Sequence, residues 1–320
     1  MKTMTIKSNL LRCGVVALLT VAGSLFAAAP AYKVDRSFGK DVFKSDPVSI
    51  AVDAGDQLHV LLRNGTVVNC DADGKTTGSF KADMMSAPGA MAEADGKLYL
   101  FQTKKSEKEI EYQGKKIKTQ VSEGVVCGVF DLTGKKISEF NLPEAQSAAA
   151  AHFVGKELAV GDFAKSQILF YDLSGSEPKV TQKITKQFRL CCGIFDFCPG
   201  TVPGSIVVAN LGAFKVQTYT GGVKTSEFGQ RGTGFEDFQS CCNPVNVVCL
   251  ADGSYVTIEK DPTRVKIFDQ NGKTCTAVQG LDELVKGCYI VPAVVDSKGS
   301  IYLVASQQNR VVKCVPTGNK

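Results

Sequence analysis

Short apolar runs, separated by turns rich in Asp, Asn and Gly, recur along the whole chain. Each unit has an apolar strand, a tight turn, a second apolar strand, a polar loop and a third strand ending on an aromatic residue or Cys. The second strands are LHVLL from Leu58, LYLFQ from Leu98, LAVGD from Leu158, IVVAN from Ile206, YVTIE from Tyr255 and IYLVA from Ile301. The third strands end at Cys70, Phe130, Tyr171, Tyr219, Phe268 and Cys314, 41 to 60 residues apart. This pattern predicts six β-sheet repeats.

A period of about 40–50 residues is typical of a four-stranded propeller blade. One blade cannot bury both faces of its sheet, so blades pack around an axis, and closing the ring protects the sheet edges. The pattern therefore predicts an all-β, six-bladed β-propeller of four-stranded blades over residues 32–320. The segment 33–43 resembles the outer-strand segment 224–230. We expect it to complete the sixth blade, so that strands from both termini close the ring. The alternative, a β-sandwich with chance repetition, is disfavoured by six aligned strands.

Residues 1–31 have the pattern of a cleaved export signal. Lys2, Lys7 and Arg12 precede or flank the start of an apolar run, and small residues end it before Tyr32. The alternative is a transmembrane anchor, but the apolar run is shorter than the roughly 20 residues needed to span a bilayer. We expect an exported protein, periplasmic or extracellular, with no membrane span after signal cleavage.

Charge and cysteine content narrow the function. The formal net charge is +5, and the predicted signal carries three positive charges and no negative one, which leaves +2. This balance gives no reason to expect nucleic acid as a partner. All but one of the 12 Cys lie beyond the signal. In an oxidising compartment cysteines usually form disulfides, and an odd number leaves at least one free, bound or paired between chains.

The stretch 228–273 resembles an NHL repeat. It begins with Phe228-Gly229, has Pro244 before its first strand and Asp252-Gly253 in the turn, and ends on Asn271-Gly272. It is also similar to exported bacterial NHL-type proteins that carry the Cys-Cys-Asn-Pro motif found here at 241–244. The resemblance covers the predicted mature chain and is sharpest in the fourth to sixth units. It implies a six-bladed propeller used mainly for binding, although ring-shaped enzymes share the architecture. A fold alone does not assign a function.

Five cysteines occupy matching places in the last three units, in the connection that enters the first strand. They are Cys191, Cys192, Cys241, Cys242 and Cys288. Because first strands crowd the axis, we expect these five side chains to be neighbours at the mouth of the central pore. Disulfides that link the three blades would suit an oxidising compartment. Two alternatives stay open: thiolates that hold zinc or copper(I), and a redox-active pair of adjacent cysteines.

A polar set marks the start of the connection from strand two to strand three, which opens on the same face. Equivalent positions carry Asp162, Asn210 and Glu259 in three consecutive units, and Leu62 and Ala305 in the first and last. Oxygen atoms converging from adjacent blades would suit calcium. The alternative is that each side chain caps its own turn by bonding backbone N–H groups.

Basic residues on this face could contact an anionic ligand: Lys260 beside Glu259, Arg264 and Arg63. The predicted ligand-binding residues of this pore-mouth face are Asp162, Asn210, Asn243, Glu259, Lys260 and Arg264. The sequence predicts no cofactor, with calcium and a thiolate-bound metal as the alternatives.

The second unit contains an insertion at 104–124. Ile110, Tyr112 and Ile117 alternate with charges around Gln113-Gly114, a pattern that predicts a projecting hairpin. Residues 104–118 hold six Lys and three Glu. The hairpin is either a solvated surface feature or a basic flap beside the pore mouth.

The sequence favours a binding module over an enzyme. His59 and His152 fall in different strands of different units, which disfavours a histidine-zinc lyase. No Gly-x-Ser-x-Gly elbow, phosphate-binding loop or c-type haem motif occurs in the sequence. We expect an unidentified protein or small molecule to bind the pore-mouth face. The alternatives are a metal-assisted lyase or hydrolase, or a thiol-redox protein, using the same face.

Overall fold

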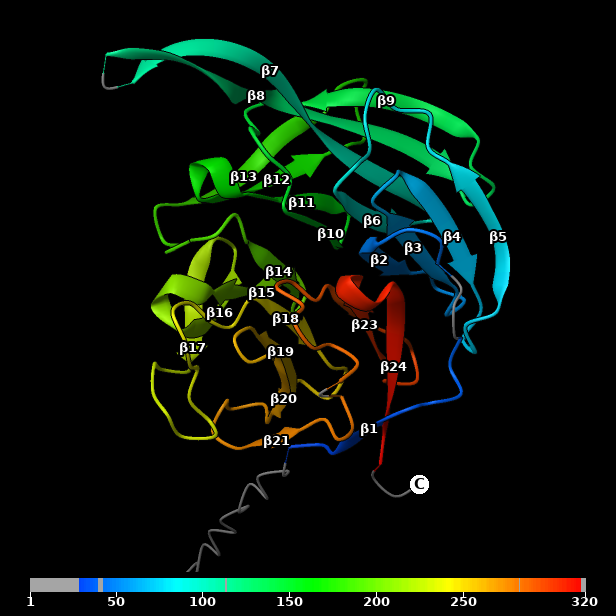
Figure 1. Ribbon diagram of the computed structural model, residues 1–320, viewed down its shortest axis with the longest axis vertical. Helices are drawn as coiled ribbons and strands as arrows, with labels where there is room; N and C mark the ends of the chain where they lie inside the picture. Colours follow the sequence, from blue (N-terminus) through cyan, green and yellow to red (C-terminus); the bar gives the residue numbers. More distant parts are fainter. Residues whose placement is uncertain (1–28, 40–42, 113, 282, 318–320) are drawn as a thin grey trace, which may run out of the picture.

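The computed structural model describes residues 29–39, 43–112, 114–281 and 283–317. Six four-stranded antiparallel sheets stand around a central axis, and the first strand of each repeat unit lies innermost (Figure 1). The predicted all-β, six-bladed propeller is therefore confirmed. The predicted export signal lies outside the described residues, apart from its last three. No helix in the described part of the chain is long and apolar enough to cross a membrane.

The blades follow one another in chain order. Blade 1 comprises β2 (Pro47–Val52), β3 (Leu58–Leu62), β4 (Thr66–Cys70) and β5 (Thr76–Lys81); blade 2, β6 (Ala90–Ala94), β7 (Lys97–Tyr112), β8 (Lys115–Asp131) and β9 (Lys136–Leu142); blade 3, β10 (Ala150–Val154), β11 (Glu157–Asp162), β12 (Gln167–Asp172) and β13 (Lys179–Thr185). Blade 4 comprises β14 (Asp196–Pro199), β15 (Ser205–Asn210), β16 (Lys215–Thr220) and β17 (Val223–Phe228); blade 5, β18 (Asn246–Cys249), β19 (Tyr255–Glu259), β20 (Arg264–Phe268) and β21 (Cys275–Ala277).

Blade 6 is built from both ends of the chain. Its inner strands are β22 (Ala293–Val295), β23 (Ile301–Ala305) and β24 (Arg310–Pro316), and its outer strand is β1 (Tyr32–Val34). In the antiparallel register, Tyr32 lies opposite Pro316 and Val34 lies opposite Cys314. Beyond the pair, the backbone N–H of Thr317 donates to the carbonyl of Ala31 at 2.8 Å. The two termini of the ring therefore lie side by side.

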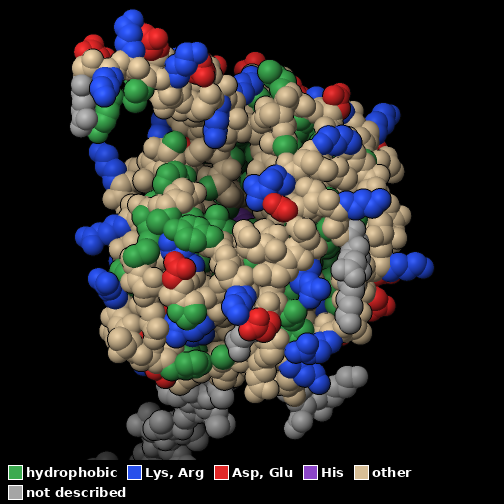
Figure 2. All heavy atoms as spheres, in the orientation of Figure 1, with side chains coloured by type: hydrophobic (Ala, Val, Ile, Leu, Met, Phe, Trp, Pro, Cys, Tyr) green, Lys and Arg blue, Asp and Glu red, His purple; other side chains and the backbone are tan. Residues whose placement is uncertain are grey.

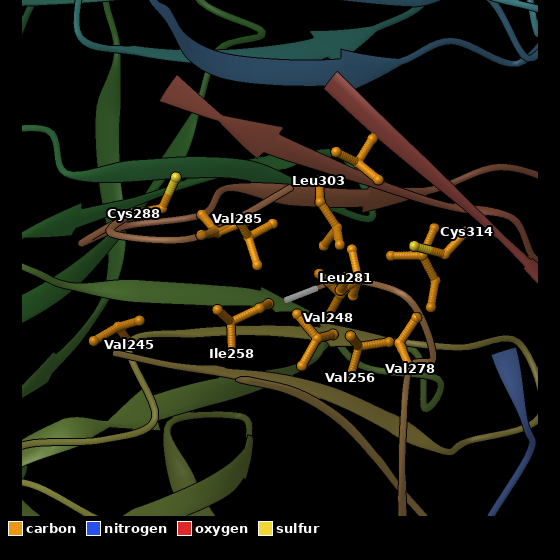
Figure 3. Packing of buried hydrophobic residues seen from close by; sticks show 14 of the residues in the cluster. Val245, Val248, Val256, Ile258, Val278, Leu281, Val285, Cys288, Leu303 and Cys314 are labelled. Atoms are coloured by element: carbon orange, nitrogen blue, oxygen red, sulfur yellow. The ribbon is translucent and has the colours of Figure 1, made fainter. Parts of the chain in front are cut away.

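The second strand of each blade is covered on both faces, which explains its nearly continuous apolar sequence. Every residue of β3, β15 and β23 is buried, whereas nearly every residue of the outer strand β17 is exposed. Between blades 5 and 6, Val256 and Ile258 of β19 belong to the same apolar core as Leu303 of β23 (Figure 3). Loss of apolar area from water, at roughly 25 cal/mol per Å², makes these inter-blade cores the main stabilising term.

A recurrent joint couples the outer strand of one blade to the next blade. The Phe228 ring at the end of β17 lies against Gly272, in the turn between β20 and β21. Phe80 of β5 lies in the same way against Gly134, and the Phe38-Gly39 segment against Gly74. All three turn glycines have positive φ, and an added Cβ would clash with the Phe or Gly segment packed against it. We call these three pairs the Phe–Gly joints.

The insertion in blade 2 is a two-stranded extension of β7 and β8. Pairing continues past a bulge at Lys104/Lys105 as far as Tyr112 opposite Lys115. The extension stands out from the ring in Figure 1, and Figure 2 shows basic side chains along it, all of them Lys. Its ion pairs are exposed: Lys116 with Glu109 at 2.9 Å and Lys118 with Glu107 at 2.8 Å.

Candidate functional site

The predicted ligand residues at the ends of the second strands bind the protein's own loops. The buried carboxylate of Asp162 accepts hydrogen bonds from the backbone N–H groups of Gln146 (3.1 Å) and Ser147 (3.0 Å). It also accepts from the Ser147 hydroxyl at 2.8 Å and from Gln167 Nε2 at 3.0 Å. Both backbone donors belong to the loop that enters β10. Asp162 thus fixes a loop 15 residues upstream rather than its own turn.

Asn210 and Asn243 likewise bond backbone groups of the loops that enter the first strands of the next two blades. Asn210 accepts from the Arg189 N–H at 2.7 Å and donates to the Gln187 carbonyl at 3.0 Å, both in the loop that enters β14. Asn243 is fully buried and bridges Gln239 and Lys260: its amide donates to both carbonyls, and its oxygen accepts from the Lys260 N–H at 2.9 Å. The Asn243-Pro244 peptide bond is cis.

Glu259 is the centre of a buried charge network. Its carboxylate contacts Lys266 Nζ at 2.7 Å and Arg264 Nη2 at 2.6 Å, and accepts from the Gln239 N–H at 3.1 Å. The Lys266 side chain is completely buried, and its ammonium also donates to two loop carbonyls. Burial is the largest influence on the pKa of Lys266 and lowers it. Arg264 is already paired with Glu259, so its charge is neutralised within the protein.

The hydrogen bonds and ion pairs of Asp162 and Arg264 would compete with the calcium ion or the anion predicted to bind there. A calcium ion at Asp162 would have to displace four donors, and an anion at Arg264 would compete with Glu259. Calcium stays a prediction. Arg63, in contrast, is exposed and pairs only at the surface, with Asp46 at 2.9 Å.

Four of the five predicted cysteines lie together where the loops into β14 and β18 meet. A disulfide joins Cys191 to Cys242. The free thiol of Cys192 lies 3.8 Å from Cys242 Sγ, and that of Cys241 lies 3.1 Å from it. The sulfur atoms of Cys191, Cys192 and Cys242 are all within 4.8 Å of one another, the spacing of a thiolate metal site. We call Cys191, Cys192, Cys241 and Cys242 the cysteine group.

Cys288 lies outside the cysteine group. It is buried, and its thiol donates to Gln308 Oε1 at 3.2 Å. Burial raises the pKa of this thiol. Figure 3 places it at the edge of the apolar core between blades 5 and 6. In the described residues it forms neither a disulfide nor a sulfur–sulfur hydrogen bond, so the single five-cysteine cluster expected from the sequence is not what the structure contains.

The cysteine group touches a buried lysine and an exposed tyrosine. Lys260 is 1% exposed, and its amine lies 3.5 Å from Cys192 Sγ and 2.6 Å from the Tyr289 hydroxyl. The same amine sits 4.0 Å from the centroid of the Tyr289 ring, a cation–π contact. Burial lowers the pKa of Lys260, but its hydrogen bonds to Tyr289 and Cys192 outweigh burial and the pKa is raised. The amine therefore stays charged.

Sequence reasoning did not single out Tyr289, although a signal for it existed. Cys191-Cys192, Cys241-Cys242 and Cys288-Tyr289 each begin five residues before the first strand of their blade. Tyr289 therefore occupies the position of the second cysteine in blade 6. The repeat alignment could have placed it beside the cysteine group.

Two cavities open near the cysteine group. A central cavity of about 190 Å³ lies on the axis, among the starts of the first strands. A side cavity of about 430 Å³ lies between blades 6 and 1 and is lined by Arg63, Pro88, Tyr289 and Ile290 among others. Figure 2 shows this face hollowed near its centre. Ile290 and Pro292 line both cavities, so the two are neighbours on the pore-mouth face.

The central cavity holds two titratable groups. Burial raises the pKa of Asp196 to about 7, against the hydrogen bonds from Val247 and Asn246 that lower it. Burial lowers the pKa of His152 to about 4, and its ring packs edge-on against Phe197. His59 lies elsewhere, in β3, hydrogen-bonded to Asn69 at 2.9 Å.

Fold and site together define a six-bladed β-propeller with a disulfide-linked cysteine group on its pore-mouth face. Comparison of the chain with models of known protein families and with curated proteins returned no match. The likeness to NHL repeats therefore rests on the sequence motif and on the blade architecture.

Proposed function

We propose that this chain is an exported binding propeller of the NHL type, whose ligand occupies the side cavity of the pore-mouth face. The observation that carries the proposal is the side cavity itself. At about 430 Å³ it is within the size range of small-molecule sites. The predicted leader supports export, and a disulfide between blades accords with an oxidising compartment.

The lining of the side cavity favours a ligand with an apolar body and an acidic group. Pro88, Ile290 and Pro292 supply apolar surface, and Ile290 remains 38% exposed. The guanidinium of Arg63 is the cation of this lining, and a planar guanidinium suits a carboxylate. The ligand is a small organic acid or a protein loop that presents the same chemistry.

Fragment screening by saturation-transfer NMR tests this proposal. A set of aromatic and aliphatic carboxylic acids, with their neutral amides as references, is screened against the folded protein. We expect acids to bind more tightly than amides, and Arg63→Ala to weaken the acids by about tenfold, the worth of one charge-assisted hydrogen bond of roughly 1.5 kcal/mol.

Two further variants locate the binding. Ile290→Ser should weaken acids and amides alike, because it removes apolar contact. Val202→Ser is the matched control, since Val202 is exposed in the turn between β14 and β15, at the opposite end of the first strands. Hits that respond equally to Ile290→Ser and Val202→Ser would contradict binding at the side cavity.

A further inference from the structure

Two free thiols flank one disulfide in the cysteine group, and only one of them has polar partners. Cys192 and Cys241 are both exposed, and both lie close to Cys242 Sγ. The amine of Lys260 donates to Cys192 at 3.5 Å. In the described residues, Cys241 has no hydrogen bond except that to Cys242. The chain thus contains an internal comparison between two neighbouring thiols.

The surroundings of Cys192 favour its thiolate. Hydrogen bonding from the Tyr289 hydroxyl is the largest cause that lowers the pKa of Cys192, and the hydrogen bond and charge of Lys260 lower it further. The thiolate, not the thiol, is the nucleophile in sulfur chemistry. Reactive cysteines typically lie at exposed positions beside a cation, as Cys192 does.

Other free cysteines have the opposite character. Burial raises the pKa of six thiols: Cys70, Cys127, Cys198, Cys275, Cys288 and Cys314. Thiols of this kind are inert and serve packing. An exposed thiolate held beside a disulfide has no packing role, so its setting points to chemistry.

We propose that the cysteine group is a thiol–disulfide exchange site, in which Cys192 is the attacking residue and Lys260 and Tyr289 are positioning residues. The substrate is an organic disulfide, R–S–S–R, that reaches the exposed pore-mouth face. The Cys192 thiolate attacks one substrate sulfur, and a bond forms between that sulfur and Cys192 Sγ. The substrate S–S bond breaks, and the departing thiolate, RS⁻, takes a proton from water. The reverse step, with a thiol RSH, regenerates Cys192.

The same thiolate has a second electrophile within the protein. Attack of Cys192 on Cys242 Sγ, 3.8 Å away, forms a Cys192–Cys242 bond and breaks the Cys191–Cys242 bond. Cys191 then leaves as a thiolate and takes a proton from water. No electrons are gained or lost by the protein, so the bridge exchanges partners without any oxidant.

The first test compares Cys192 with Cys241 in the exported protein, isolated with its bridge intact. Dipyridyl disulfide is the optical probe and oxidised glutathione the second probe, with peptide mass mapping of the modified residue. At pH 6–7 we expect Cys192 to react faster than Cys241, because the ammonium of Lys260 lies beside Cys192 Sγ and favours its thiolate. Equal rates for the two thiols would overturn the proposal.

The second test assigns the positioning residues through a pH profile. Tyr289→Phe removes only the hydroxyl, and Lys260→Met removes the charge. Each should move the midpoint of the Cys192 rate profile to higher pH, whereas Lys165→Met, at an exposed lysine of blade 3, should leave it in place. An unchanged midpoint in both Tyr289→Phe and Lys260→Met would overturn the roles assigned to them. Circular dichroism checks that each variant is folded, and Tyr289→Phe serves if Lys260→Met is not.

The third test detects the partner exchange and the metal alternative. Cys191→Ser leaves Cys192 and Cys242 as two free thiols, and oxidised glutathione is supplied as the oxidant. We expect Cys192 to form a mixed disulfide with glutathione and Cys242 to displace the second glutathione thiolate. The products are a Cys192–Cys242 bridge and two molecules of reduced glutathione, with loss of the fast thiol. Absence of that bridge would overturn the internal step. Elemental analysis of the isolated wild-type protein accompanies the assay: stoichiometric zinc or copper with no reactive thiol at Cys192 would overturn the proposal in favour of a thiolate metal site.

Exchange at Cys192 goes beyond the binding proposed for the side cavity, and the two fail separately. The NMR screen measures ligand binding that depends on Arg63 and Ile290, whereas the thiol assay measures the reaction rate of Cys192. Acids that bind without a fast Cys192 would refute exchange alone. A fast Cys192 without acid binding would refute the ligand site alone.

Discussion

Polar residues at the ends of the second strands show how a repeat protein can satisfy buried polar groups through bonds to its own loops. Asp162, Asn210 and Glu259 each hold the loop that enters their own blade. The repeat alignment predicted that they are equivalent. It could not predict that their partners include backbone groups 15 to 23 residues upstream, because that depends on how the loop folds back.

The Glu259 network gives the first prediction. Glu259→Gln leaves the ammonium of Lys266 buried without its carboxylate, and breaking a buried pair typically costs about 3–5 kcal/mol. Urea denaturation followed by circular dichroism should show a loss of that size. The matched control is Glu144→Gln, which breaks the exposed pair with Lys183 and should cost less than about 1 kcal/mol. Similar losses in both variants would contradict the buried network.

Asp196 gives a prediction about pH. Its pKa in the folded protein, about 7, lies above the ordinary 3.8, so the folded state holds the proton more tightly than the unfolded state. Stability should therefore fall as pH rises from about 4 through 7 and level off above that range. Asp196→Asn cannot ionise and keeps an acceptor for the Val247 N–H.

Melting curves at several pH values measure this effect. The melting temperature of Asp196→Asn should exceed that of the wild type at pH 8, and the difference should shrink towards pH 4. A difference that is constant with pH would show that Asp196 does not ionise in this range.

Predicting the chemistry at the residue scale was harder than predicting the repeat. The matching positions of Cys191-Cys192 and Cys241-Cys242 follow from the alignment of units. The pairing of Cys191 with Cys242, and the hydrogen bond of the Cys288 thiol to Gln308, depend on how each loop folds. Sequence spacing does not encode the path of a loop.

At the scale of single elements, strands were the most predictable part of the molecule. The six second strands can be predicted because burial on both faces makes them apolar throughout. Turn residues mark both ends of each strand. The outer strand β17 is exposed and the outer strand β21 is partly buried, so neither has that continuous apolar signal. The extension of β7 and β8 was visible because Ile110 and Ile117 alternate with charges on paired strands.

This extension carries the third prediction. Replacing residues 105–121 by a short Gly-containing turn should leave folding and melting temperature nearly unchanged, because the extension is largely exposed. The replacement keeps Ser122, whose hydroxyl donates to the Gln146 carbonyl. Size-exclusion chromatography and thermal melts measure the result. Aggregation of the shortened protein would mean that the extension shields part of the ring.

For the whole molecule, closure by β1 is the feature that stability should depend on most. A chain that begins at Phe38 lacks β1 and leaves the edge of β24 unpaired. We expect a lower melting temperature, by about 2 °C for each kcal/mol lost in a chain of this size. The control is a chain that begins at Tyr32. Identical melts for the two chains would contradict closure of the ring by β1.

The Phe–Gly joints give the ring a direction. In each joint the phenylalanine lies at the outer edge of one blade and the glycine belongs to the next blade around the ring. Blade 3 has no aromatic ring against Gly175, in its turn between β12 and β13. Since Ala31 and Thr317 are hydrogen-bonded neighbours, a short linker can join residue 317 to residue 31. The ring is therefore suited to circular permutation: opened at 173–178 and joined from residue 317 to residue 31, it would keep all three joints and the sixth blade in one continuous chain.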